Sequence, residues 1–264
     1  MSKLAILISR SCIKLTANLL KVSCYGFHWA LPRTRFEIPL SDSALLKRRT
    51  LAIIPKTLWQ TNFTNRVTLP VYLNYLFNRV MSPTHAYRFM SDQDAAKFIQ
   101  EHYPREVFQA YSKLQIGAAR ADFWRVLVLQ KLGGVYLDMD AHLVWPIEKI
   151  VKAGQGELYL KIKTGEISNY FMASKPNNPN LAKLIDRIRT NIETSSSTDV
   201  YSLTGPGVFN DVFAGIDVPT RYYKYTCNQG NFTNEHFQYM DKPQGKWTRE
   251  QERVDVIRKE SDPA

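Results

Sequence analysis

The chain has 264 residues, of which 44% are hydrophobic, and a formal net charge of +11. This length and composition exclude a disordered or fibrous protein and are sufficient for one sizeable hydrophobic core. The three cysteines, Cys12, Cys24 and Cys227, are widely spaced and form no CxxC pair, which excludes a disulfide-rich scaffold and favours a reducing compartment.

The positive charge is concentrated near the amino terminus. Residues 1–50 hold nine lysines and arginines against two acids, so nine minus two, or +7 of the +11, lies in this segment. Charged residues interrupt the apolar ones between positions 1 and 27. We therefore expect neither a membrane-spanning helix, which needs about 20 continuous apolar residues, nor a signal peptide.

The apolar residues of this segment have the spacing of an amphipathic helix on lipid headgroups: Leu4, Ile8, Leu15, Leu19 and Leu20. An ordinary packing helix fits the same periodicity. We expect residues 1–45 to form a basic arm and residues 46–264 to form one domain. Residues 1–49 then contact an anionic membrane surface or act as a solubilising tail. No nucleic-acid partner is expected, because no zinc-finger, basic-zipper or RNP-like pattern accompanies the charge.

Strand and helix signals alternate after residue 50. The run from Leu51 to Gln60 predicts the first core strand, and residues 85–90 predict a second, short strand. Ser91 is a suitable cap for a helix over residues 94–102. Pro104 ends that helix and begins another that runs through Tyr111.

The same alternation continues through the second half of the chain. A helical pattern covers residues 117–132 and stops at the pair Gly133-Gly134. Residues 135–137, 158–162 and 167–173 predict strands, and residues 180–193 predict a helix. Residues 194–198 form a polar linker, and a loop over 203–209 leads into a further helix. Together these elements predict a mixed α/β domain.

The sequence Asp138-Met139-Asp140 directly follows the predicted buried strand 135–137. Residues i and i+2 of an extended chain point to the same side, so both carboxylates can converge on one cation. Carboxylate oxygens suit Mg²⁺ or Mn²⁺, which also bind phosphate oxygens. Such an ion would hold a diphosphate and stabilise the negative charge as it leaves. A pair of acids alone is weak evidence, because most exposed acidic pairs are only solvated.

Other stretches accompany this pair in a defined order: Ile54-Pro55-Lys56-Thr57-Leu58-Trp59-Gln60-Thr61, Arg120-Ala121-Asp122-Phe123-Trp124-Arg125, Gly133-Gly134-Val135-Tyr136, Ser174-Lys175-Pro176-Asn177-Asn178-Pro179 and Thr204-Gly205-Pro206-Gly207. This order, over roughly residues 52–247, resembles the glycosyltransferases that carry the DXD sugar-binding motif. That family includes the yeast initiating α-1,6-mannosyltransferase, the catalytic domains of clostridial glucosylating toxins, and bacterial capsule and lipopolysaccharide glycosyltransferases.

The resemblance implies a GT-A-like, nucleotide-sugar-binding α/β fold with a mixed central sheet flanked by helices. It also implies an Mn²⁺- or Mg²⁺-dependent transferase that retains the anomeric configuration and uses a UDP- or GDP-sugar donor. Asp138 and Asp140 match the family's metal and nucleotide-sugar pair, and Asp122 matches the aspartate that holds the donor's sugar hydroxyls. Arg125 matches the arginine beside that sugar, although a salt bridge with Asp122 is an alternative. Arg120 is a second candidate.

The sequence departs from the family pattern at two places. Many relatives have a second tryptophan that stacks on the nucleotide base, where this chain has Asn62. Base stacking would then fall to Trp59, Phe63 or another aromatic residue, and a core position is the alternative for Trp59. Relatives often carry a histidine metal ligand near the carboxyl terminus. The nearest histidine here is His236, eleven residues before Trp247. Lys246 could meet the diphosphate instead.

The expected function is transfer of a hexose-type sugar to a glycan or glycolipid acceptor in bacterial surface polysaccharide or lipopolysaccharide synthesis. The expected location is the cytoplasm or, peripherally, the inner face of the cytoplasmic membrane. One alternative is a haloacid-dehalogenase-like phosphatase, which would have Thr or Val where this chain has His142, and a later acidic pair that is missing. The other is a non-catalytic module that binds a membrane surface.

Overall fold

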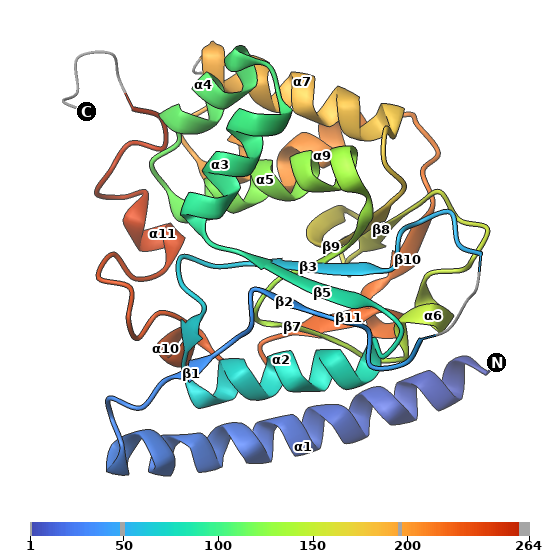
Figure 1. Ribbon diagram of the computed structural model, residues 1–264, viewed down its shortest axis with the longest axis vertical. Helices are drawn as coiled ribbons and strands as arrows, with labels where there is room; N and C mark the ends of the chain where they lie inside the picture. The colour runs from blue at the N-terminus through green and yellow to red at the C-terminus, as the bar shows by residue number, and fades with distance from the viewer. Residues whose placement is uncertain (1, 48–50, 195–196, 259–264) are drawn as a thin grey trace.

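A mixed β-sheet lies between two layers of helices in the computed structural model, which describes residues 2–47, 51–194 and 197–258 (Figure 1). Seven strands of the described chain form this sheet in the order β10-β8-β9-β6-β3-β5-β2. Their bounds are Thr220–Tyr222, Glu157–Lys161, Ile167–Ser174, Gly134–Leu137, Thr57–Thr61, Ala86–Met90 and Ser41–Asp42. β3 is parallel to β5 and β6, whereas β9 is antiparallel to β6 and β8. The predicted α/β fold with a mixed central sheet flanked by helices is confirmed.

Helices cover both faces of the sheet. One face carries α3 (Asp92–His102), α4 (Arg105–Lys113), α5 (Gly117–Leu132), α7 (Pro179–Glu193), α8 (Val200–Leu203) and α9 (Pro206–Val212). The other carries α2 (Leu69–Met81) and α6 (Ile147–Ile150), and α1 (Lys3–Ala30) lies outside α2 (Figure 1). The remaining elements are short: β1 (Phe36–Glu37), β4 (Arg66–Val67), β7 (Ala141–Leu143), the 3₁₀ helix η1 (Tyr223–Tyr225), β11 (Cys227–Gln229), α10 (Glu235–Gln238) and α11 (Trp247–Glu250).

Side-chain alternation along the strands fills a separate core on each face. Tyr136 of β6 packs under the layer that contains α5, whereas Val135 and Leu137 pack toward α2. This alternation follows from the two-residue period of an extended chain. All four residues of β6 are buried, which explains why its sequence is apolar without interruption.

Most predicted elements occur where the sequence indicated. Ser91 caps α3 through a capping box, in which the Ser91 Oγ accepts from the Asp94 N–H and the Asp94 carboxylate accepts from the Ser91 N–H. The predicted strand 51–60 is wrong at its start, because only Thr57–Thr61 pair as β3. Pro55 lacks the N–H that a central strand needs. Residues 195 and 196 of the predicted linker lie outside the described residues, as do Arg48 and Arg49 of the basic arm.

The amino-terminal arm is mostly helix and packs along the body. His28, near the end of α1, accepts a hydrogen bond at Nε2 from the N–H of Leu69, the first residue of α2, at 3.1 Å. Arg10 donates to the Asn228 side chain and Lys21 to the Gly230 carbonyl. The described residues include no helix with both the length and the hydropathy needed to cross a membrane.

Gly133 and Gly134 turn the chain sharply from α5 into β6. Their φ angles are 66° and 117°, which side chains with a Cβ rarely adopt. A Cβ on Gly133 would lie 2.8 Å from the rings of Pro55 and Pro176, and one on Gly134 would lie 2.7 Å from the Thr57 carbonyl oxygen. The pair therefore sets the distance between the end of α5 and the start of β6.

Replacing Gly134 with alanine should lower the free energy of unfolding by about 2–5 kcal/mol, the sum of backbone strain and overpacking. Two other glycines separate these causes. Gly165 has φ 94° but open space around it, so Gly165→Ala should show strain alone, and Gly154 has neither problem. Urea unfolding of the three variants tests the ranking, and a Gly134→Ala variant as stable as Gly154→Ala would contradict it.

Burial lowers the pKa of His85 to about 4. Between pH 6.5 and 4 the unfolded chain therefore binds a proton at this residue that the folded chain does not. Stability should fall as the pH falls through this window, by about 2 kcal/mol at this site between pH 7 and pH 5. Urea unfolding at both pH values should show a smaller loss for His85→Gln than for the wild type. Equal losses would show that His85 does not titrate in this way.

Candidate active site

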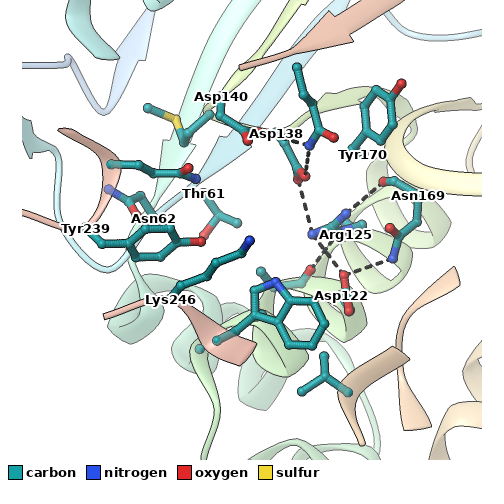
Figure 2. A pocket seen from close by; sticks show the side chains of 18 of the residues that line it. Thr61, Asn62, Asp122, Arg125, Asp138, Asp140, Asn169, Tyr170, Tyr239 and Lys246 are labelled. Carbon is teal, nitrogen blue, oxygen red and sulfur yellow. Dashed lines mark hydrogen bonds and ion pairs between the residues drawn. The ribbon is translucent and has the colours of Figure 1, made fainter. Parts of the chain in front are cut away.

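A cleft of about 520 Å³ opens beyond the carboxyl end of β6 (Figure 2). Its lining comes from the end of β3, the first turns of α5, the residues after β6, the start of β9, the end of β11 and the carboxyl-terminal segment. Ligands of α/β proteins commonly bind beyond the carboxyl ends of strands. The cleft also lies within the usual size range of small-molecule sites, about 300–1,000 Å³.

Asp138 and Asp140 reach this cleft from a tight turn that follows β6. The Ala141 N–H donates to the Asp138 carbonyl at 3.0 Å, so the two acids flank a turn and not a straight strand. The Asn74 amide of α2 holds this turn from behind, donating to the carbonyls of Met139 at 2.7 Å and Ala141 at 2.9 Å. Burial and the neighbouring Asp138 charge raise the pKa of Asp140.

Gln229, the last residue of β11, bridges the two carboxylates. Its Nε2 donates to Asp138 Oδ2 at 3.2 Å and to Asp140 Oδ1 at 3.1 Å. The register between β11 and β7 sets this position, because Gln229 lies opposite Ala141. An amide N–H₂ group therefore lies between two acids, at the place where a shared cation would balance their charge.

The Arg125 guanidinium joins α5 to the end of β6. Its Nη2 lies 3.0 Å from Asp122 Oδ1 and 3.2 Å from Asp138 Oδ1, and its Nη1 donates to the Asn169 carbonyl at 2.8 Å (Figure 2). The guanidinium carbon also lies 4.4 Å from the centre of the Tyr136 ring. Arg125 is 4% exposed, so one buried cation balances two carboxylates from different elements.

The two oxygens of Asp122 differ in their surroundings. Oδ1 pairs with Arg125 and accepts from the Asn169 amide at 2.9 Å, whereas Oδ2 makes a longer bond of 3.4 Å with Thr204 Oγ1. Burial raises the pKa of Asp122 to about 6, although the positive charge of Arg125 opposes this shift. Asp122 thus keeps one oxygen with weaker contacts beside the cleft.

The carboxyl-terminal segment, residues 230–258, forms one wall of the cleft. Tyr239, Lys242, Lys246 and Trp247 line it. Lys242 is held by a 2.7 Å ion pair with Glu250, whereas Lys246 is half-exposed and lies 3.8 Å from Glu235. Figure 2 shows the Lys246 side chain reaching toward the side of the cleft where Asp138 and Asp140 lie.

The structure brings together four of the residues expected at the site, Asp122, Arg125, Asp138 and Asp140. Three others lie elsewhere: Trp59, Arg120 and His236. The Trp59 indole is buried, donates to the Gly133 carbonyl at 2.9 Å and packs edge-on against Trp124, so it cannot stack on a base in the cleft. Phe63 does line the cleft.

Arg120 is not among the residues that line the cleft, and it donates through Nε to the Leu114 carbonyl at 2.7 Å. His236 is exposed and stacks on Tyr25 of α1, with ring centroids 5.7 Å apart. The predictions that Arg120 contacts the donor and that His236 binds metal therefore gain no support from their positions.

Sequence reasoning missed Gln229 entirely and did not place Asn169 among the catalytic residues. Gln229 is separated from Asp140 by 89 residues and belongs to no recognisable motif, so only the pairing of β11 with β7 brings it to the site. Asn169 is on β9, where its side chain and carbonyl hold Asp122 and Arg125.

The acidic pair fits a divalent cation of the Mg²⁺ or Mn²⁺ type. Within the described residues no group of three or more His, Cys, Asp or Glu side chains is placed to hold a metal. Such ions are commonly bound by one or two carboxylates, with water and substrate phosphates as the other ligands. Asp138 and Asp140 supply this donor set, and the Gln229 amide between them marks a place suited to positive charge.

Comparison with known proteins identifies this region. Residues 70–156 match the family model described as glycosyltransferase sugar-binding region containing DXD motif. The chain is 22% identical over 216 residues to an initiation-specific α-1,6-mannosyltransferase of Schizosaccharomyces pombe, an alignment that covers 70% of this chain and 52% of that protein. It is 25% identical to an uncharacterized glycosyltransferase of Acanthamoeba polyphaga mimivirus, with 69% and 77% covered. The chain thus spans about half the length of the yeast relative.

Among solved structures, one named PaToxG Glycosyltransferase is 16% identical, with a TM-score of 0.48 over 79% of this chain and 80% of that one. The matched region 70–156 includes Asp122, Arg125, Asp138 and Asp140. The similarity to glycosyltransferases with the DXD sugar-binding motif, which the sequence motifs indicated, is therefore confirmed.

Replacing Arg125 with methionine should destabilise the fold by about 3–5 kcal/mol, because Asp122 and Asp138 lose their shared cation. Arg189 offers a matched control. It forms a partly exposed pair with Glu193 at 3.7 Å, and its replacement by methionine should cost at most about 1 kcal/mol. Chemical denaturation measures the free energy of unfolding of both variants. Equal losses would show that the ion pairs of Arg125 contribute no more to stability than an ion pair at the surface.

Proposed function

We propose that this chain, which carries the DXD sugar-binding region of glycosyltransferases, transfers a hexose-type sugar from a nucleoside-diphosphate sugar to a glycan or glycolipid acceptor. The observation that carries the proposal is the acidic pair at the cleft. Asp138 and Asp140 share the Gln229 amide and lie beside the buried Asp122–Arg125 pair. A GT-A-like mode of donor binding agrees with a site beyond the end of β6.

Asp138 and Asp140 would hold Mn²⁺ or Mg²⁺ together with the donor diphosphate. A bound divalent cation supplies electrostatic stabilisation of the negative charge on the leaving nucleoside diphosphate. The Gln229 amide N–H₂ group would have to leave the space between the acids, and rotation of the same amide can present its oxygen instead. Burial and, to a smaller extent, the Asp138 charge raise the pKa of Asp140, and a bound cation would offset both effects.

Other cleft residues would contact the remaining parts of the donor. We assign Asp122 Oδ2 to a sugar hydroxyl, since Oδ1 already pairs with Arg125 and Asn169. Arg125 holds Asp122 and Asp138 in their relative positions. Lys246 would meet the diphosphate as a point charge. Phe63, Tyr239 and Trp247 supply aromatic surface for the base in place of the buried Trp59.

Retention of the anomeric configuration, the choice between UDP and GDP, and an acceptor in bacterial surface polysaccharide or lipopolysaccharide stay predictions drawn from the family resemblance. Identification of the best donor decides between UDP and GDP, and the anomeric configuration of the product relative to that donor decides retention.

Mn²⁺ and the correct nucleotide sugar together should raise the thermal unfolding temperature, since binding to the native state at 100 times Kd adds about 2.7 kcal/mol. A panel of UDP- and GDP-sugars identifies the donor. Asp140→Asn should abolish both this stabilisation and sugar transfer. Without ligands it should be at least as stable as the wild type, because it removes the repulsion from Asp138.

Asp186→Asn is the matched control, because Asp186 is exposed on α7, away from the cleft. It should bind donor and transfer sugar like the wild type. Near-normal turnover by a folded Asp140→Asn variant would contradict the proposed function.

A further inference from the structure

Helix α1 has two apolar faces, and only one of them packs on the protein. The inner face is buried through Ile6, Ala17, Cys24 and His28. The outer stripe consists of large side chains that are 56–88% exposed: Leu4, Ile8, Leu15, Leu19, Val22 and Trp29. Their spacing of three, four or seven residues places them along one side of the helix. The sequence had indicated an amphipathic helix here, but packing on the body leaves its most apolar side uncovered.

The charges of α1 lie outside this outer stripe, and around the helix they are closer to the inner face. Lys3, Arg10, Lys14 and Lys21 follow a spacing of seven, four and seven residues, which gathers them on one flank. No acidic residue precedes Glu37 in the sequence. Arg10 and Lys21 also bond to the body, so these contacts help to fix the orientation of α1 in which the outer stripe is exposed.

We propose that the outer stripe of α1 docks flat on a bilayer that contains anionic lipid. From Leu4 to Trp29 the stripe is about 38 Å long at 1.5 Å per residue. A helix in this position buries its apolar side at the level of the headgroups, and the net positive charge of α1, which has no acidic residue, attracts it to an anionic surface. Charge complementarity favours lipid over a second copy of this chain, because two copies would bring two positively charged helices together.

Docking through the outer stripe would also place the cleft near the bilayer. Lys21 of α1 donates to the Gly230 carbonyl at 2.8 Å, and the Asn234 amide donates to the Tyr25 hydroxyl at 2.6 Å. Gly230 and Asn234 both line the cleft. An acceptor glycan attached to a lipid of the same bilayer would therefore meet the cleft at its rim. This part of the inference rests on the proposed function, whereas docking itself does not.

Cosedimentation of the full chain with vesicles tests the docking, without metal or nucleotide sugar. The wild type should bind phosphatidylcholine vesicles that contain phosphatidylglycerol, and should bind pure phosphatidylcholine or vesicles in high salt more weakly. Leu15→Gln/Leu19→Gln keeps the charge and removes two apolar anchors, so it should bind on the order of tenfold more weakly or worse. Leu132→Gln/Val254→Gln, which alters two exposed apolar residues outside α1, should bind like the wild type.

Equal binding by the two double variants would overturn the proposal. It would also be overturned if the wild type failed to bind and instead formed a dimer that Leu15→Gln/Leu19→Gln dissociates, as measured by sedimentation velocity. Circular dichroism and thermal unfolding establish that both variants are folded. Vesicle binding without any response to nucleotide sugars would leave docking intact and would remove the proposed function alone.

Discussion

The arrangement of the site depends on one buried guanidinium. Arg125 pairs with Asp122 on its own helix and with Asp138 beyond β6, and it reaches β9 through the Asn169 carbonyl. Each carboxylate would be costly to bury alone, and the shared cation makes both tolerable. Because the contacts come from three elements, α5 and the two strands can hold only a narrow range of relative positions. The same ion pairs that stabilise the core thus also orient the acids at the cleft.

The backbone prepares this arrangement at Gly133 and Gly134. A direct turn from α5 into β6 places the first turns of the helix beside the end of the strand, so Asp122 and Arg125 face Asp138 although thirteen or more residues separate them. The positive φ angles and the close approach of Pro55, Pro176 and Thr57 leave no room for a Cβ. The backbone conformation of the two glycines therefore determines how Asp122 and Arg125 lie relative to Asp138.

Local patterns allowed much of this structure to be predicted. The capping residue Ser91, the breaker Pro104 and the Gly133-Gly134 pair located elements closely, because each acts on its own neighbourhood. The motif order brought Asp122, Arg125, Asp138 and Asp140 to one site. Trp59 was wrongly expected to stack on the base, because its position depends on packing against a distant segment. Gln229 was missed, because only the pairing of β11 with β7 brings it to the site. Periodicity likewise identified an apolar side of α1 but could not indicate which side would face the body.

Helix α2 links two regions that the sequence presents as unrelated. At its start, the Leu69 N–H is bound by His28 of α1; farther along, Asn74 holds the carbonyls of Met139 and Ala141 around the acidic turn. These hydrogen bonds all involve the same helix, which therefore connects α1 to the acidic turn. The outward side of α1 and the carboxylates at the cleft are consequently held at a fixed angle to each other, so any surface that orients α1 also aims the mouth of the cleft.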